Sequence, residues 1–370
     1  MKENVDMKKL IALLMAMVMV FGLVACGGAE KAEEAPAAEA PAAEAPAAEA
    51  PAAEAPVEEA PKGYKIGLTN SFNGNTYRQQ MEAYFTEVCE AMKADGIISE
   101  YTISEANNDA NAQISHIESF ILDEYDVIIV DPCSSTALNG AIQEAVDAGI
   151  PVIAINDGPV EFSHELFYDM VFAGDDMMYD LTTYVCEAMG GEGSLIELRG
   201  TAGTAFDDLA HSGVVKALEN YPNVEVVAEI YTDWTGSTAQ QELASVLPTL
   251  DGVDGVVTQG GDAYAAVQAF ISAGMDLPII AGDNRGYFLK WWLNDAPEGY
   301  DTLSMSANPW VGGACVYVAI DVLNGETVSN FINFPNGAVT ADLLEQFADL
   351  EDEGIGTPTY DWDWVRETLY

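Results

Sequence analysis

The sequence is poor in basic residues. Its 370 residues include 13 Lys and Arg against 61 Asp and Glu, which gives a formal net charge of -48 at pH 7. Nucleic acids and anionic lipid surfaces bind proteins through clustered Lys and Arg side chains. The composition therefore disfavours both as direct partners of the chain.

Histidine and paired cysteines are also scarce. His116, His164 and His211 have no spacing typical of zinc ligands, and the four cysteines after residue 26 form no paired motif. We interpret those cysteines as small hydrophobic residues. No G-x-S-x-G elbow is present, and the glycine-rich run at 190–193 precedes a predicted strand, the reverse of a dinucleotide site. The sequence thus predicts no metal, no cofactor and no catalysis.

Only one long apolar run is present, near the beginning of the chain. Lys2, Lys8 and Lys9 precede an uncharged stretch at 10–25 that is rich in Leu, Met and Val. This order of charged and apolar segments predicts an export signal over residues 1–25. The run is short for a transmembrane helix, which needs about 20 apolar residues, and no later segment is a better candidate.

The apolar run ends in Leu23-Val24-Ala25-Cys26, followed by two glycines. This ending resembles the lipobox of bacterial lipoproteins. The resemblance implies that Cys26 is the site of lipid attachment and becomes the mature N-terminus. Several acyl chains on one cysteine anchor a protein firmly, so we expect membrane attachment through this N-terminal lipid alone.

Residues 26–62 form a low-complexity segment of Glu, Ala and Pro. The unit Glu-Ala-Pro-Ala-Ala recurs between residues 34 and 53, and a proline stands at every fifth position from 36 to 61. Each proline lacks an N–H group and clashes with the preceding helical turn, so a continuous helix cannot form. The composition predicts an extended, charged linker between anchor and body.

From residue 63 onward, short β-branched runs alternate with amphipathic stretches, the pattern of parallel α/β layers. The first set predicts strands at 65–69, 98–105, 126–131 and 151–155 and helices at 76–94, 110–124 and 136–149. The second predicts strands at 193–198, 223–230, 254–258, 277–281 and 302–306 and helices at 206–220, 238–250, 262–274 and 285–294. A further helix at 311–324 and a segment at 328–334 follow.

These elements predict an α/β fold with two doubly wound parallel-sheet lobes joined by a multi-strand hinge. We assign residues 63–174 and 309–336 to the N-terminal lobe, and residues 175–308 and 337–370 to the C-terminal lobe. A body of about 300 residues suits two such domains in one monomer. Open parallel sheets bind ligands at the carboxyl ends of their strands, so two facing sheets define a cleft.

Polar and aromatic side chains gather at these predicted strand ends. They are Ser71, Asn75, Tyr77, Arg78, Asn156, Asp157, Trp234, Gly260, Asp262 and Asp283. A hydrogen bond to a charged group contributes about 1.5–3 kcal/mol, so two or three such residues can set specificity. Each Asn or Asp has a structural alternative as a helix cap or turn residue, and Asn75 is a good N-cap. We interpret Trp234 as a stacking platform, because its loop has no apolar periodicity.

The body resembles the type I periplasmic sugar-binding proteins of ABC importers, the ribose-binding-like group, across nearly all of residues 64–340. The motifs that carry this resemblance are the loop with Asn75 and Tyr77, Asp131-Pro132, Gly149-Ile150-Pro151-Val152-Ile153, Gly200-Thr201-Ala202-Gly203-Thr204 and Gly282-Asp283. The resemblance implies the type I periplasmic binding protein fold and a cleft that closes on a small polar ligand, first of all a monosaccharide. It also implies partners: an ABC permease and ATPase at the outer face of the cell membrane.

Carried over by position, the resemblance makes Trp234 the aromatic wall, Asp283 a hydroxyl-binding carboxylate and Asn308 a residue near the hinge. Two positions depart from the family pattern. Ala210 stands where many members carry an arginine, and Asn156 where an aspartate is common. Arg78 and His211 are candidates to replace the missing charge. A nucleoside-binding lipoprotein, or a sugar-signal receptor coupled to a sensor kinase, stays open as an alternative.

Overall fold

A computed structural model of the chain describes residues 63–156 and 159–370. The predicted export signal, Cys26, the linker and Asp157 lie outside the described residues. No helix in the described part of the chain is both long and apolar enough to cross a bilayer.

The N-terminal lobe is built on a six-stranded parallel sheet with the order β11-β5-β4-β3-β1-β2. Its strands are β1 (Tyr64–Asn70), β2 (Ile98–Glu105), β3 (Val127–Asp131), β4 (Val152–Asn156), β5 (Phe167–Phe172) and β11 (Phe331–Phe334). Its helices are α2 (Thr76–Ala94), α3 (Ala110–Leu122), α4 (Asn139–Asp147) and α10 (Val311–Leu323). This order is that of a doubly wound sheet, as predicted.

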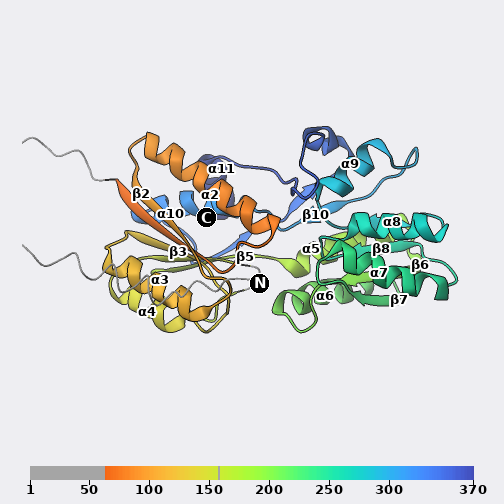
Figure 1. Ribbon diagram of the computed structural model, residues 1–370, viewed down its shortest axis with the longest axis horizontal. Helices are drawn as coiled ribbons and strands as arrows, with labels where there is room; N and C mark the ends of the chain where they lie inside the picture. The colour runs from red at the N-terminus through yellow and green to blue at the C-terminus, as the bar shows by residue number, and fades with distance from the viewer. Residues whose placement is uncertain (1–62, 157–158) are drawn as a thin grey trace, which may run out of the picture. The chain divides into compact units, whose positions relative to one another are not determined.

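Alternation along the strands explains why both faces of this sheet are covered. In β3, Val127 and Ile129 pack in one core with α2 and α10, while Ile128 and Val130 pack in another with α3 and α4. Successive strand side chains point to opposite faces, so an all-apolar strand needs helices on both. Figure 1 shows α2 and α10 on one side of this sheet and α3 and α4 on the other.

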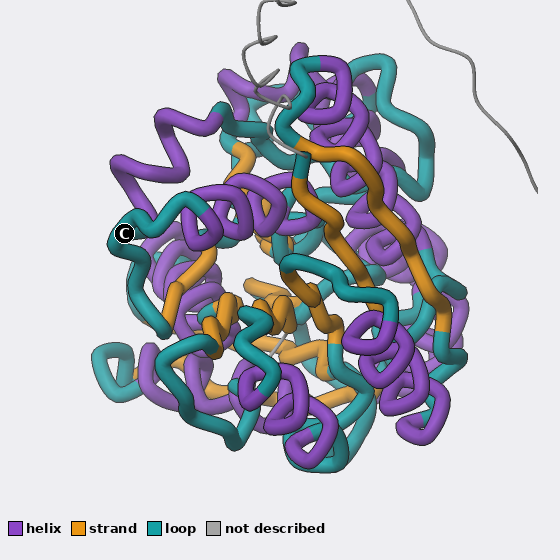
Figure 2. The backbone as a smooth tube through the Cα atoms, turned by 90° about the vertical axis from the view of Figure 1, so that its left-hand side faces the viewer, coloured by secondary structure: helices purple, strands orange, loops and turns teal. Residues whose placement is uncertain are grey.

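The C-terminal lobe repeats the design with the parallel order β7-β6-β8-β9. Its strands are β6 (Glu192–Arg199), β7 (Asn223–Tyr231), β8 (Gly255–Thr258) and β9 (Ile279–Ala281). Its helices are α5 (Gly174–Ala188), α6 (Ala205–Leu218), α7 (Gly236–Val246), α8 (Ala263–Ala273) and α9 (Gly286–Asn294), with a short 3-10 turn at Leu247–Thr249. One core joins the sheet to α7, α8 and α9, and another joins it to α5 and α6. Figure 2 shows helices flanking strands on both sides.

One strand of the N-terminal sheet and two α-helices were not predicted from the sequence. The stretch at 156–176 was expected to be a polar, aromatic connection, but it contains β5, whose Met170 and Phe172 enter the N-terminal core. Helix α5 buries Met177 and Leu181 against the C-terminal sheet. The third element is the last helix, α11 (Trp362–Leu369).

The predicted strand at 302–306 does not join the second sheet as expected. It forms β10 (Ser304–Ser306), which pairs antiparallel with β12 (Gly337–Val339) in a separate two-stranded sheet. The chain passes between the lobes after β5, between β10 and α10, and between β11 and β12. These passages form the multi-strand hinge.

The C-terminal tail divides between the lobes, whereas the sequence analysis placed all of 337–370 on the C-terminal lobe. A 3-10 segment at Ala341–Phe347 packs against α9, but α11 packs on α10 of the N-terminal lobe. Val365 and Leu369 of α11 enter the N-terminal core, and the helix also bonds to Asp321 on α10, a fully buried carboxylate. It accepts hydrogen bonds from Trp362 Nε1 (2.9 Å), Arg366 Nε (2.9 Å) and the Tyr370 hydroxyl (2.8 Å).

Candidate ligand-binding cavity

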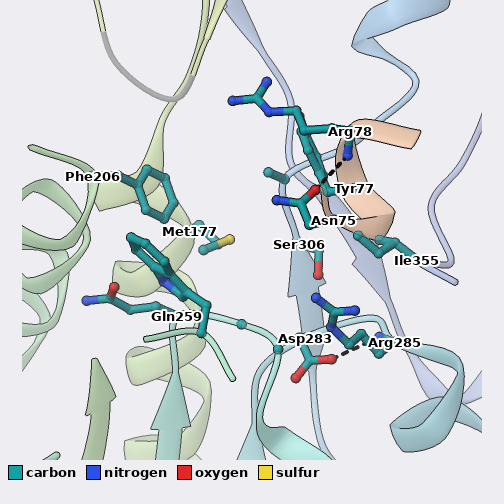
Figure 3. A pocket seen from close by; sticks show the side chains of 14 residues that line it. Asn75, Tyr77, Arg78, Met177, Phe206, Gln259, Asp283, Arg285, Ser306 and Ile355 are labelled. Carbon is teal, nitrogen blue, oxygen red and sulfur yellow. Dashed lines mark hydrogen bonds between the residues drawn. The ribbon is translucent and has the colours of Figure 1, made fainter. Parts of the chain in front are cut away.

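A cavity of about 240 Å³ is lined by both lobes and by the tail. The N-terminal lobe contributes Asn75, Tyr77 and Arg78 from the beginning of α2. The rest of the lining comprises Met177, Phe206, Trp234, Gln259, Gly260, Gly261, Asp283, Arg285, Ser306, Ala307 and Ile355. Figure 3 shows these side chains facing one another across the cavity. It lies where the strands' carboxyl ends meet, as parallel α/β sheets require.

The first turn of α2 places three predicted residues at the cavity. The Asn75 side chain caps the helix by accepting a hydrogen bond from the Arg78 N–H at 2.9 Å. This cap fixes where the helix begins and therefore where Tyr77 and Arg78 point. Arg78 Nη1 lies 2.8 Å from Asp131 Oδ1, at the end of β3. Ser71, which was predicted to bind ligand, instead donates to Asp131 Oδ2 at 2.8 Å and does not line the cavity.

Trp234 forms an aromatic wall on the C-terminal lobe. Asp233 and Trp234 both have left-handed backbone angles, with φ of 53° and 52°, which turn this loop back on itself. The indole lies against Gly200, where an added Cβ would come within 2.0 Å of the ring. The Phe206 ring lies 6.0 Å away, centroid to centroid, and extends the apolar wall. The position suits a stacking role, which stays a prediction.

Asp283 supplies a fixed carboxylate at the edge of the cavity. Its Oδ2 accepts from the N–H groups of Asp262 (3.1 Å) and Ala263 (2.9 Å), and its Oδ1 accepts from the Arg285 N–H (3.0 Å). Ala263 begins α8, so the carboxylate also lies at a positive helix end. Each carboxylate oxygen has two acceptor sites. Oδ1 therefore retains one for a ligand hydroxyl.

Asp262, the other predicted carboxylate, lies behind the wall and not in the cavity. It is almost fully buried, and its Oδ2 is 2.5 Å from the Thr232 hydroxyl, which also lies 2.8 Å from the Arg199 carbonyl oxygen. A hydroxyl has one proton and a carbonyl oxygen only accepts, so Thr232 can satisfy both contacts only if Asp262 is protonated. Burial raises the pKa of Asp262 to about 7, with a smaller contribution from the Asp283 charge.

The structure adds lining residues that the sequence analysis did not select. Arg285 pairs with Glu353 of the tail at 2.7 Å. It follows Asp283 by two residues, so its position beside a predicted site residue was a signal in the sequence that could have found it. Ser306 accepts a hydrogen bond from the Asn284 N–H at 2.9 Å. Met177, Phe206 and Ile355 had no local signal, because only the packing of α5, α6 and the tail brings them here.

Among the remaining predicted residues that the structure describes, only one lines the cavity. Gly260 lines it, with a left-handed φ of 126°. Asn308 is fully buried in the hinge, where its Oδ1 accepts from the Trp310 N–H and the Thr357 hydroxyl. Asn156 is the last residue of β4. Asp157 lies outside the described residues.

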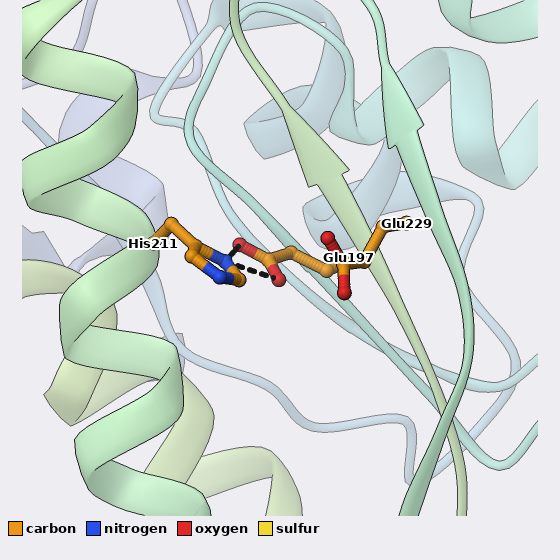
Figure 4. A group of neighbouring side chains, drawn as sticks. All are labelled: Glu197, His211 and Glu229. Carbon is orange, nitrogen blue, oxygen red and sulfur yellow. Dashed lines mark hydrogen bonds and ion pairs between the residues drawn. The ribbon is translucent and has the colours of Figure 1, made fainter.

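His211, a candidate for the missing charge, does not reach the cavity. Its Nδ1 lies 3.0 Å from both carboxylate oxygens of Glu197. Burial raises the pKa of Glu197. Figure 4 shows Glu197, His211 and Glu229 as neighbours. Their donor atoms lie within 4.8 Å of one another, which makes them a metal-compatible group within the described part of the chain. Arg199 Nη1, 3.3 Å from Glu229, already offsets part of their negative charge.

Comparisons with known proteins identify the family to which the chain is similar. Residues 66–327 match the family described as periplasmic binding protein domain. A xylitol-binding protein of Mycolicibacterium smegmatis is 29% identical over 275 residues, covering 72% of this chain and 76% of that protein. A putative rhizopine-binding protein of Rhizobium meliloti is 26% identical over 285 residues, covering 74% and 88%.

Solved structures show the same fold. An ABC transporter solute binding protein from Thermobispora bispora superposes with a TM-score of 0.70 at 29% identity, covering 83% of this chain and 94% of that one. A solute binding protein from Bacillus halodurans, solved with bound myo-inositol, gives a TM-score of 0.65 at 23% identity, covering 78% and 98%. The predicted fold class is therefore confirmed.

We expect Gly200→Ala to displace Trp234 and to weaken ligand binding by about tenfold or more, because the added methyl group and the indole cannot share the same space. Gly140→Ala on α4 is the matched control, since nothing lies within 4 Å of a Cβ there. Calorimetric titration with the cognate ligand measures the effect. Equal affinities in the two variants would show that the Trp234 position does not matter for binding.

We expect the stability of the protein to fall as pH rises from about 4 to 7, in part because of Asp262. Its folded-state pKa of about 7 exceeds the ordinary value of about 3.9, so in this range the unfolded chain releases a proton that the folded chain keeps. Asp262→Asn mimics the protonated side chain and should flatten this slope in urea denaturation at pH 4.5, 6 and 7.5. Parallel curves for the variant and the unmodified protein would contradict the assignment.

Proposed function

The chain belongs to the periplasmic binding protein family, and we propose that it captures a monosaccharide or a closely related polyol between its lobes for delivery to an ABC importer. The observation that carries this proposal is the meeting, in one cavity, of the Trp234 ring with the carboxylate of Asp283 and the cation of Arg285. Sugars combine an apolar C–H face with a rim of hydroxyl groups. An aromatic platform with fixed acceptors and donors at its edge suits both.

The charge of the cavity supports a neutral ligand. Arg78 is paired with Asp131 and Arg285 with Glu353, so both lining cations already have counter-charges. The relatives named for xylitol and for a rhizopine, and the solved structure with bound myo-inositol, favour a ligand with several hydroxyl groups.

A binding role fits this cavity better than catalysis does. The Asp283 carboxylate is held in place by three backbone N–H groups, which suits a fixed acceptor for a ligand hydroxyl. The lining residues contain no Ser–His or Cys–His pair that would form an activated nucleophile.

Hinge closure is the mechanism we propose for capture and release. A ligand that contacts Tyr77 and Arg78 on one lobe and Trp234 and Asp283 on the other stabilises the closed arrangement through contacts that the open one lacks. Ligand binding thereby changes the arrangement of the two lobes. A permease and its ATPase, as partners, can recognise that change.

We also propose that Cys26 tethers the protein to the outer face of the membrane. The charged and apolar segments before it and the proline-rich linker after it support this proposal. A linker of extended conformation spans about 3.1 Å per residue, so the 26–62 segment gives the body a long reach while holding it near the importer.

A thermal-shift screen of the body, residues 62–370, against pentoses, hexoses, deoxysugars, polyols, nucleosides and amino acids tests the binding function. A ligand at one hundred times its dissociation constant adds about 2.7 kcal/mol of stability. We expect hits among sugars or polyols, lost in Trp234→Ala and kept in Leu122→Ala, whose exposed side chain is far from the cavity lining. Hits with nucleosides alone would favour the nucleoside-binding alternative, since Tyr77, Phe206 and Trp234 could stack a base.

Fractionation of bacterial cells that express the full chain tests the anchor. The unmodified protein should sediment with membranes, and Cys26→Ala should lose lipid attachment and appear as unprocessed or released protein. Metabolic labelling with a fatty-acid analogue gives a second readout. Labelling of the alanine variant to the same level would place the lipid on another residue.

A further inference from the structure

The tail contains a segment, residues 350–358, that is bonded to both lobes; we name it the tail strap. On the C-terminal lobe, the N–H groups of Gly286 and Tyr287 at the beginning of α9 donate to the carbonyl oxygens of Gly354 and Asp352, each at 2.9 Å. The Gly356 N–H donates to the Asn284 carbonyl oxygen at 2.9 Å. These backbone bonds fix the strap against the end of the cavity that holds Asp283 and Arg285.

Gln80 on the N-terminal lobe holds the strap at Ile355, and Asn308 in the hinge holds it at Thr357 and Pro358. Gln80 of α2 accepts from the Ile355 N–H at 2.8 Å and donates to the Ile355 carbonyl oxygen at 3.2 Å. One amide thus satisfies both backbone groups of one residue, which fixes its position and orientation. Gln80 lies two residues after Arg78, so the same helix turn that faces the cavity also holds the strap.

Close packing leaves the strap little freedom on the C-terminal side. An added Cβ at Gly286 would lie 2.1 Å from the Glu351 carbonyl oxygen, and one at Gly356 would lie 2.8 Å from side chains of Leu289 and Phe347. The glycines allow the strap backbone to lie directly against α9. The side chain that this arrangement presents to the cavity is Ile355.

Ile355 is an apolar group among polar neighbours. It is 6% exposed and lines the cavity beside Ser306 and Asn75, as Figure 3 shows. A hydrocarbon side chain offers no partner to a hydroxyl group, and burying an unpartnered hydroxyl is costly. A ligand atom that contacts Ile355 is therefore favoured when it carries hydrogen or a methyl group instead of a hydroxyl.

We propose that Ile355 is a specificity-determining residue of the cavity, held in position by Gln80, and that it selects ligands with a C–H or methyl group at one ring position. The chemical class this favours is a deoxy sugar or a polyol with one position free of hydroxyl. The inference rests on the proposed sugar-binding function. It assigns Gln80 as a positioning residue that contacts the strap and not the ligand.

Calorimetric titration of paired ligands tests this proposal. Each pair comprises a deoxy sugar and its hydroxylated parent, taken from the hits of the thermal-shift screen. The unmodified protein should prefer the deoxy member by about tenfold or more. Ile355→Thr keeps the branch at Cβ but replaces the ethyl group with a hydroxyl, so it should reduce or reverse this ratio. Thr359→Ala, an exposed position just beyond the strap, should leave the ratio unchanged.

Variants of Gln80 separate positioning from folding. Gln80→Ala removes both hydrogen bonds to Ile355 and should lower affinity and the deoxy preference together, with a modest fall in the melting temperature of the free protein. Gln80→Glu keeps the acceptor for the Ile355 N–H and should retain an intermediate preference.

The outcomes distinguish the proposed sugar-binding function from the proposed role of Ile355. If no sugar or polyol binds the unmodified protein, the proposed function fails. If sugars bind but Ile355→Thr keeps the same ratio within every pair, the function stands and the role of Ile355 is refuted. An unchanged ratio in Gln80→Ala would likewise refute the positioning role of Gln80.

Discussion

In the C-terminal lobe, the Asp283 carboxylate accepts hydrogen bonds from three backbone N–H groups that come from two different helix beginnings. Those bonds tie the starts of α8 and α9 to the end of β9. Two features of the cavity lie next to these bonds. Only glycine fits at position 261, because an added Cβ would lie 2.3 Å from the Trp234 carbonyl oxygen. The Arg285 side chain, whose backbone N–H bonds to Asp283, reaches Glu353 of the tail strap. The carboxylate thus joins the beginnings of α8 and α9 beside the aromatic wall and the strap.

Two of the few basic residues of the protein lie at the cavity. Basic residues are rare in the chain, yet Arg78 and Arg285 both line the cavity, each paired with a carboxylate. The surrounding acidity keeps the protein soluble and repels anions. The paired arginines offer hydrogen-bond donors without a large net charge. A neutral, hydroxyl-rich ligand suits that combination better than a charged one.

Elements with a local sequence pattern were predicted well, whereas an element held by contacts with residues far away in the sequence was missed. The strands predicted at 126–131 and 151–155 match β3 and β4 closely, since a strand buried on both faces is a continuous apolar run that any window reveals. Helix α11 was missed, because it is eight residues long and its contacts come from distant parts of the chain. Val365 and Leu369 pack in the N-terminal core, and Trp362, Arg366 and Tyr370 bond to Asp321, 41–49 residues earlier. These distant contacts place the helix on that lobe.

The sequence by itself determined the α/β class, the two lobes and the set of strand ends at which a ligand could bind, because these follow from local periodicity. It did not determine which polar residues face the ligand. Ser71, Asp262 and Asn308 are of the same types as Asn75 and Asp283 and stand at similar places, but their hydrogen bonds turn them to support Asp131, Thr232 and the tail. Phe206 and Ile355 reach the cavity only when α6 and the tail pack. Only the tertiary structure could make that choice, since each side chain's orientation depends on partners far away in the sequence.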